Sequence, residues 1–167
     1  MNQSLSDPIP PDVREGSRVL LETTNWVVGI PAAMHAMHWW GAFTEWCVAL
    51  DHGMFNSYLA EGALIVFRSR KTSSRWALHT STGEFRNDRN RRASWSGFLM
   101  RHPEIAGGLL HELARLNPPD PIPIKPLVEG LSALAELVRH HAYDKPMVAM
   151  HVGEMEGAAM RALDYAK

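Results

Sequence analysis

The sequence predicts an α+β fold in which a small, mainly antiparallel sheet is packed by a cysteine-bearing helix and by C-terminal helices. Runs of β-type residues gather before Arg89, whereas helix-type patterns follow Pro103. Two of the runs alternate apolar and polar residues on either side of Thr82-Gly83, which is typical of a hairpin. Strands and helices that occupy separate parts of a chain favour the α+β class.

The domain organisation follows from length and proline content. Residues 1–11 are polar and Pro-rich, which predicts a flexible arm. Residues 12–167 are long enough for one core and are expected to form a single domain, with a mixed core at 12–103 and a helical part at 104–167. Prolines within 117–126 predict an extended connector, because each proline disfavours helix in the residue before it.

The first elements of the mixed core are two short strands and a helix. Residues 19–21 and 25–28 are β-type runs, and 44–60 predicts a helix with Thr44 as its N-cap. Cys47, Leu50, Met54 and Tyr58 then share one apolar helix face. A continuous apolar run at 63–67 predicts a central strand that is buried on both faces.

The hairpin at 75–88 places two sets of side chains on opposite faces. Trp76, Leu78 and Phe85 face the core, whereas His79 and Arg86 lie on the other face. A two-residue turn pairs His79 with Arg86 and Ala77 with Asp88. His79 and Asp88 become diagonal neighbours, close enough for their side chains nearly to meet.

Composition excludes several classes of function. The net charge is −1, so no overall attraction to nucleic acid or anionic membrane is expected. No apolar run approaches the length of a membrane span, and one cysteine with nine methionines fits a reducing cytoplasm. No residue pattern predicts a cofactor.

Cys47 is the one cysteine of the chain, so it cannot form an internal disulfide. It is a small residue packed in the core, a metal ligand or a nucleophile. A helix that begins at Thr44 would place the thiol in its first turn, where free N–H groups favour a thiolate. Glu45 lies in the same turn and opposes that effect.

A pattern of aromatic, glycine and polar residues surrounds Cys47. It consists of Trp40-Gly41, Thr44, Trp46-Cys47-Val48, Tyr58, Gly62-Ala63-Leu64, Arg68, Trp76-Ala77-Leu78-His79, Gly83-Glu84-Phe85 and Asp88. This pattern resembles a family of uncharacterised proteins from phages, prophages and conjugative elements. The resemblance runs from Thr23 to about Ile105 and covers roughly half of the chain. Part of it is also similar to PcfJ-like conjugation proteins. It implies a mobile-element context and no settled activity.

One hypothesis for the chemistry is a catalytic triad. Cys47, His79 and Asp88 occur in the chain order of transglutaminase-like and arylamine-acetyltransferase-like thiol enzymes. In such a site the thiolate attacks a carbonyl, the imidazole moves the proton and the carboxylate orients the imidazole. The protein would then be a small cytoplasmic thiol hydrolase or acyltransferase. The alternative is that Cys47 packs in the core and the face of His79 is solvated.

A zinc site is a further alternative. His35, His38 and Cys47 could supply three ligands, but no fourth ligand fixes the spacing. No spacing typical of zinc ligands relates His140, His141 and His151 to other candidate ligands. We therefore predict no metal.

A basic segment suggests binding rather than catalysis. Nine cations and two acids lie between residues 68 and 101, which gives this segment a net charge of +7 and the rest of the chain −8. Such a surface could contact a host protein, a nucleoprotein or defence complex, or nucleic acid. Aromatic residues interleave with the cations, as in single-strand binders. The alternative is a set of solvated loops. The candidate contact residues are Arg68, Arg70, Lys71, Arg75, Arg86, Arg89, Arg91 and Arg92.

Overall fold

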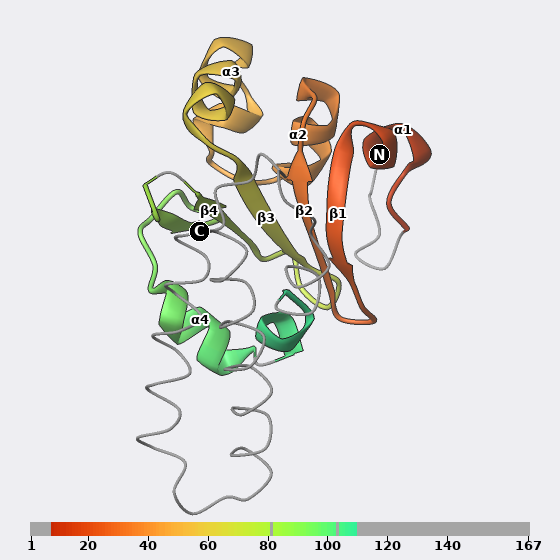
Figure 1. The fold of residues 1–167 in the computed structure, drawn as a ribbon, viewed down its shortest axis with the longest axis vertical. Coiled ribbons are helices and arrows are strands. Elements are labelled where there is room, and N and C mark those ends of the chain that lie inside the picture. The colour runs from red at the N-terminus through yellow and green to blue at the C-terminus, as the bar shows by residue number, and fades with distance from the viewer. Residues whose placement is uncertain (1–7, 81, 103, 110–167) are drawn as a thin grey trace, which may run out of the picture. The chain divides into compact units, whose positions relative to one another are not determined.

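The computed structural model describes residues 8–80, 82–102 and 104–109. The chain divides into two compact units, Met1–Ala93 and Ser94–Lys167. Figure 1 shows the elements of the first unit around one sheet. In chain order the elements are α1 (Pro11–Glu15), β1 (Ser17–Glu22), β2 (Trp26–Pro31), α2 (Met34–Trp40), η1 (Cys47–Ala49), α3 (His52–Glu61), β3 (Leu64–Ser69), β4 (Arg75–His79), β5 (Phe85–Asn87) and α4 (Trp95–Arg101).

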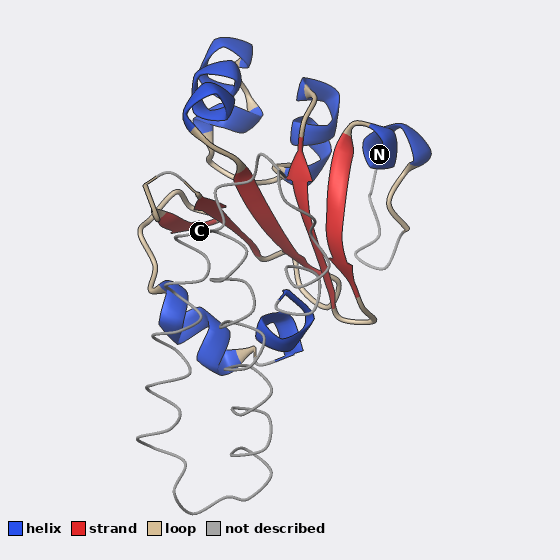
Figure 2. Cartoon of the chain, viewed as in Figure 1, coloured by secondary structure: helices blue, strands red, loops and turns tan. Residues whose placement is uncertain are grey.

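The sheet has five antiparallel strands in the order β1-β2-β3-β4-β5 (Figure 2). Each strand pairs with its neighbour in sequence, and α2, η1 and α3 are inserted between β2 and β3. Strands and helices in this arrangement confirm the α+β prediction. All six residues of β3 are buried, which confirms a central strand covered on both faces.

The β4–β5 hairpin keeps the predicted faces but not the predicted register. Ala77 pairs with Arg86 and Leu78 pairs with Phe85, two residues away from the expected pairing. The connection spans residues 80–83 rather than Thr82-Gly83, and the His79 nitrogen donates to the Glu84 carbonyl at 2.9 Å. A shift of two residues leaves every side chain on its original face, because side chains alternate with a period of two.

One face of the sheet carries the core that also holds the helices. The sheet side chains Val27, Leu64, Val66 and Ala77 form one cluster with buried residues of α1, α2, η1 and α3. Trp40 of this cluster fits against the sheet because residue 29 is glycine. A Cβ atom at Gly29 would lie 2.6 Å from the Trp40 ring.

The opposite face carries a second set of buried apolar side chains, from Trp26, Ile65, Phe67, Leu78 and Phe85. The ring centroids of Phe67 and Phe85 are 5.9 Å apart, at an edge-to-face angle of 78°. Leu78 and Phe85 are buried on the face opposite His79, as predicted, but Trp76 is only partly buried and His79 is itself buried.

The helix predicted at 44–60 is wrong in its start and in its apolar face. Thr44 caps no helix, since its hydroxyl donates to the Gly41 carbonyl at 2.7 Å. Asp51 caps α3 instead by accepting from the Met54 nitrogen at 2.8 Å. Cys47 and Leu50 are exposed, Leu50 to 78%, and Phe55 is the residue of α3 that packs in the core.

Two further predictions fall partly outside the described residues. Residues 104–109 are helical, as expected after Pro103, whereas the connector at 117–126 and the helices beyond it lie outside the described residues. The described end of the predicted arm differs from the expectation, because Ile9 is buried in the core cluster and Pro11 begins α1.

Candidate functional site

Cys47 and His79 line one pocket in the first unit. The pocket is small, with a volume of about 40 Å³, and it is open to solvent. It lies between η1, α3 and the β4–β5 hairpin, so residues far apart in the sequence meet there. Its lining residues are Trp46, Cys47, Val48, Tyr58, Leu64, Ala77, His79, Glu84, Arg86 and Asn90.

Cys47 begins the three-residue 3-10 helix η1 and is exposed. The Trp46 residue before it makes no side-chain cap, and Asp51 separates η1 from α3. A three-residue helix has almost no macrodipole, so the thiolate-stabilising helix start that we predicted is not formed here. Cys47 is therefore a solvent-accessible thiol rather than a core residue.

His79 lies at the end of β4 and is buried. Its Nε2 atom is 3.3 Å from the Tyr58 carbonyl oxygen, and its Nδ1 atom is 3.2 Å from the Thr82 hydroxyl. A carbonyl oxygen can only accept, so Nε2 carries the proton and Nδ1 accepts from Thr82. The Tyr58 ring packs against the imidazole with centroids 4.9 Å apart. Local partners therefore hold both ring nitrogens.

Asp88 follows β5 and is not one of the residues that line this pocket. Its carbonyl oxygen accepts from the Glu45 nitrogen at 2.8 Å. The negative charge of Asp88 acts on Arg75, whose pKa it raises against the larger opposing effect of burial. The structure thus brings Cys47 and His79 to one pocket and leaves Asp88 outside its wall.

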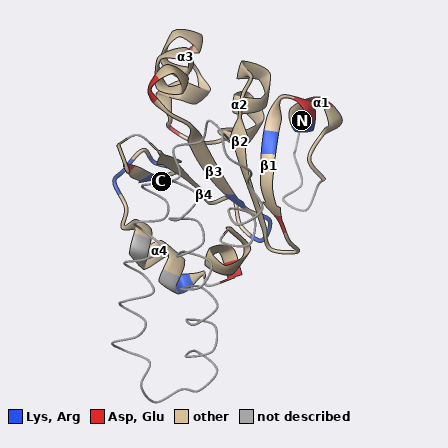
Figure 3. Ribbon diagram, in the orientation of Figure 1, with Lys and Arg blue, Asp and Glu red and all other residues tan. Residues whose placement is uncertain are grey.

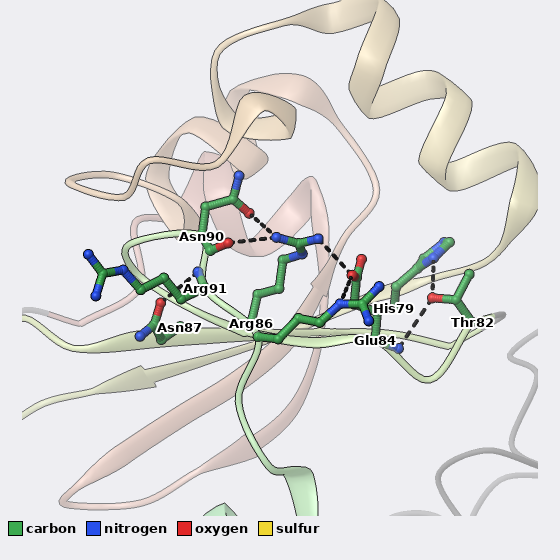
Figure 4. Close-up of polar contacts among 8 residues, drawn as sticks. His79, Thr82, Glu84, Arg86, Asn87, Asn90 and Arg91 are labelled. Atoms are coloured by element: carbon green, nitrogen blue, oxygen red, sulfur yellow. Dashed lines mark hydrogen bonds and ion pairs between the residues drawn. The ribbon is translucent and has the colours of Figure 1, made fainter.

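Glu84, Arg86 and Asn90 form the polar wall of the pocket (Figure 4). Arg86 donates from Nη2 to Glu84 at 2.7 Å and from Nη1 to the Asn90 carbonyl at 2.6 Å. The hydrogen bond from Arg86, followed by weaker effects of Arg92, holds the pKa of Glu84 below its usual range. Sequence reasoning missed Glu84 and Asn90. The spacing of Glu84 and Arg86, two residues apart on one strand face, was the available signal.

The eight candidate contact residues are divided between two places of the first unit, the end of β3 with the start of β4, and β5 with the turn after it (Figure 3). Arg68 and Arg75 are buried, and Arg70 forms an ion pair with Glu22 at 2.5 Å. Lys71, Arg89 and Arg91 are exposed, and Arg92 is exposed to 83% while it contacts Glu84. The eight candidate residues therefore do not form one solvated patch.

Metal ligands do not converge in the part of the chain that the structure describes. No group of three histidine, cysteine or acidic side chains there lies close enough to hold an ion. His35 contacts the Asp12 carbonyl at 3.0 Å through Nε2. His140, His141 and His151 lie outside the described residues.

No family model, no curated protein and no solved structure matches the chain. None of the described helices has the length and apolar character that a membrane crossing requires.

Proposed function

We propose that the protein is a non-enzymatic binding protein that docks on an acidic protein surface through the turn after β5. We call residues 87–92 the arginine turn. The observation that carries the proposal is that this turn is held rigid while Arg89 and Arg91 are left exposed. The mobile-element resemblance adds a candidate context, in which the partner is a host protein or nucleoprotein complex in the cytoplasm.

Backbone bonds give the arginine turn its rigidity. The Asn87 nitrogen donates to the Arg91 carbonyl at 3.0 Å, and Arg86 forms an isolated β-bridge with Arg92. The Asn87 side chain accepts from the nitrogens of Arg89 and Arg91 at 3.1 and 2.9 Å. Asn90 adopts a left-handed conformation with φ of 56°. A preorganised turn loses little conformational entropy on binding.

The charges of the turn are available to a partner. Three arginines and one aspartate give residues 87–92 a net charge of +2. Figure 4 shows the Arg91 guanidinium pointing away from the network that holds Arg86. Exposed charges of one sign raise association rates with a partner of the opposite sign more than they stabilise the fold.

An exposed aromatic residue beside the turn favours a protein partner over nucleic acid. Phe43 is 74% exposed, and its loop is joined to the turn by the bond from Glu45 to Asp88. Phenylalanine and arginine are enriched in protein interfaces. Within the first unit, Phe85 is buried and the ring centroid of Trp76 packs 5.8 Å from that of Trp26, so neither offers a stacking platform for bases.

The test is a titration of the full chain with a fluorescent poly-glutamate peptide and with single-stranded and double-stranded DNA at several salt concentrations. We expect salt-sensitive binding of the peptide that falls at least about tenfold in Arg89→Glu/Arg91→Glu, because a favourable contact becomes a repulsion. Lys71→Glu/Arg101→Glu is the matched control, with the same change in charge at two other exposed sites, and should bind normally. Tighter binding of DNA would change the partner class, and no binding of either would reject the proposal.

A thiol hydrolase or acyltransferase is the second candidate, favoured by the presence of Cys47 and His79 in one pocket. Both imidazole nitrogens of His79 already contact Thr82 and Tyr58. One of these two contacts has to break before the imidazole can take the thiol proton. Burst release of p-nitrophenolate from p-nitrophenyl acetate, lost in Cys47→Ser and reduced in His79→Asn, would support this candidate. A burst that survives in Cys47→Ser would reject it.

A further inference from the structure

Two buried arginines lie side by side at the end of β3 and the start of β4. Arg68 of β3 pairs directly with Arg75 of β4, so both side chains lie on the face that carries Val27 and Ala77. Arg75 has no exposed surface and Arg68 is nearly as buried. Burial of two like charges side by side is costly unless anionic groups compensate for the lost hydration.

The hydrogen bonds of Arg75 leave one edge of its guanidinium without a partner. Nη1 donates to the Ser73 carbonyl at 2.8 Å. Nε and Nη2 are both buried and have no hydrogen-bond partner among the described residues. These two nitrogens lie on the same edge of the planar group, where their N–H bonds run side by side. That edge is the fork that receives the two oxygens of a carboxylate.

The Arg75 guanidinium remains positively charged at neutral pH, so the fork attracts an anion. Burial and, to a smaller extent, the charge of Arg68 lower the pKa of Arg75 to about 10, and Asp88 acts in the opposite direction. A carboxylate presents two oxygens in one plane, which match the paired N–H bonds of this fork.

The Phe43 ring lies next to the Arg75 guanidinium. The Arg75 Cζ atom lies 5.6 Å from the centroid of the Phe43 ring, which covers the flat face of the guanidinium. Phe43 is itself mostly exposed and adopts a left-handed conformation with φ of 65°. This conformation is unfavourable for a bulky residue, so movement of Phe43 out of it relieves strain. The Nε–H and Nη2–H bonds of Arg75 lie in the plane of the guanidinium, so they can still donate while the Phe43 ring covers its flat face.

We propose that the Nε/Nη2 edge of Arg75, beside Phe43, is a binding site for a carboxylate. The carboxylate belongs either to a small organic acid or to an acidic side chain of a protein partner. The site stands on the geometry of Arg75 and does not require that the arginine turn binds anything.

The first test uses the wild-type chain, in which NMR reports on the Arg75 Nε–H group directly. Sodium acetate, N-acetylglutamate amide and a poly-glutamate peptide are added at constant ionic strength, with sodium chloride as the reference salt. The Arg75 Hε signal should move downfield and saturate with at least one carboxylate and stay in place with chloride. Saturation with acetate identifies a small-acid site, and saturation with the peptide alone identifies a side-chain site. A signal that no carboxylate moves, or that chloride moves equally, overturns the proposal.

Variants separate binding from a structural role. Arg75→Lys keeps the charge but lacks the fork, and should lose at least tenfold in affinity for the saturating carboxylate. Arg70→Lys is the control, in the connection between β3 and β4, and should keep that affinity because Arg70 is paired with Glu22. Phe43→Ala uncovers the guanidinium and should speed carboxylate association. Unchanged affinity in Arg75→Lys overturns the proposal, and the wild-type titration still decides if the variant fails to fold.

Discussion

The backbone nitrogen of Glu45 donates to the Asp88 carbonyl oxygen at 2.8 Å, which ties the loop after α2 to the turn after β5. The next residue adds a second tie, because the Trp46 indole nitrogen donates to the Asn87 carbonyl at 2.6 Å. These two bonds connect segments more than 40 residues apart and place Cys47 at the sheet edge. They position both the pocket and the arginine turn.

Trp46→Phe should lower the free energy of unfolding by about 1–3 kcal/mol, because the Asn87 carbonyl loses its indole donor. Trp39→Phe is the control. Trp39 is also buried, and its ring packs against Trp40 and the Arg68 guanidinium, contacts that a phenylalanine ring can keep in part. Urea unfolding followed by circular dichroism gives both values. Equal losses in the two variants would show that ring volume, rather than the tie to Asn87, accounts for the effect.

Glu84→Gln should destabilise the protein at neutral pH and have little effect in acid. The folded-state pKa of Glu84 lies below its unfolded value, mainly because Arg86 donates to it. The carboxylate therefore contributes stability above the unfolded pKa, and that contribution is lost as the pH falls through the folded pKa.

Denaturant unfolding of the wild type and Glu84→Gln between about pH 7 and pH 3 measures this difference. Glu22→Gln should behave in the same way, since Arg14 and Arg70 lower the pKa of Glu22. A stability difference for Glu84→Gln that stays constant with pH would contradict the assignment.

Cys47 should react with iodoacetamide in the native protein at a rate within about tenfold of the unfolded chain, because the thiol is exposed. Cys47→Ser should change the free energy of unfolding by less than about 0.5 kcal/mol, as is usual for exposed positions. Mass spectrometry gives the labelling rate, and Cys47→Ser is its blank. Protection by a factor of a hundred or more would place the thiol in the core after all.

Gly83→Ala should cost about 1 kcal/mol, because Gly83 has φ of 68° and a side chain there is strained although nothing lies within 4 Å of its Cβ position. Gly107→Ala is the matched control at an exposed helical residue that also has open space around it. That change should raise stability by up to about 1 kcal/mol. The same sign in both variants would mean that the turn at Gly83 does not require a left-handed residue.

The alternation of apolar and polar residues was enough to assign the faces of the β4–β5 hairpin. Leu78 and Phe85 lie on one side, and His79 and Arg86 lie on the other. This follows because the side-chain period of a strand is two and does not depend on distant residues. The pairing partners were wrong because the hydrogen bonds of the connection, rather than its most turn-like dipeptide, set the register.

The tertiary structure alone decided which of the reactive and charged side chains are exposed and which are buried. The spacing of Cys47, Leu50 and Met54 fits an apolar helix face, yet bonds from the preceding loop to β5 and the cap at Asp51 turn these residues outward. The burial of Arg75 opposite Arg68 could not be predicted from the sequence either, because arginine side chains are usually exposed. Periodicity is a local property that the chain carries in its residue order. Burial depends on which segments meet, and contacts between distant residues determine that.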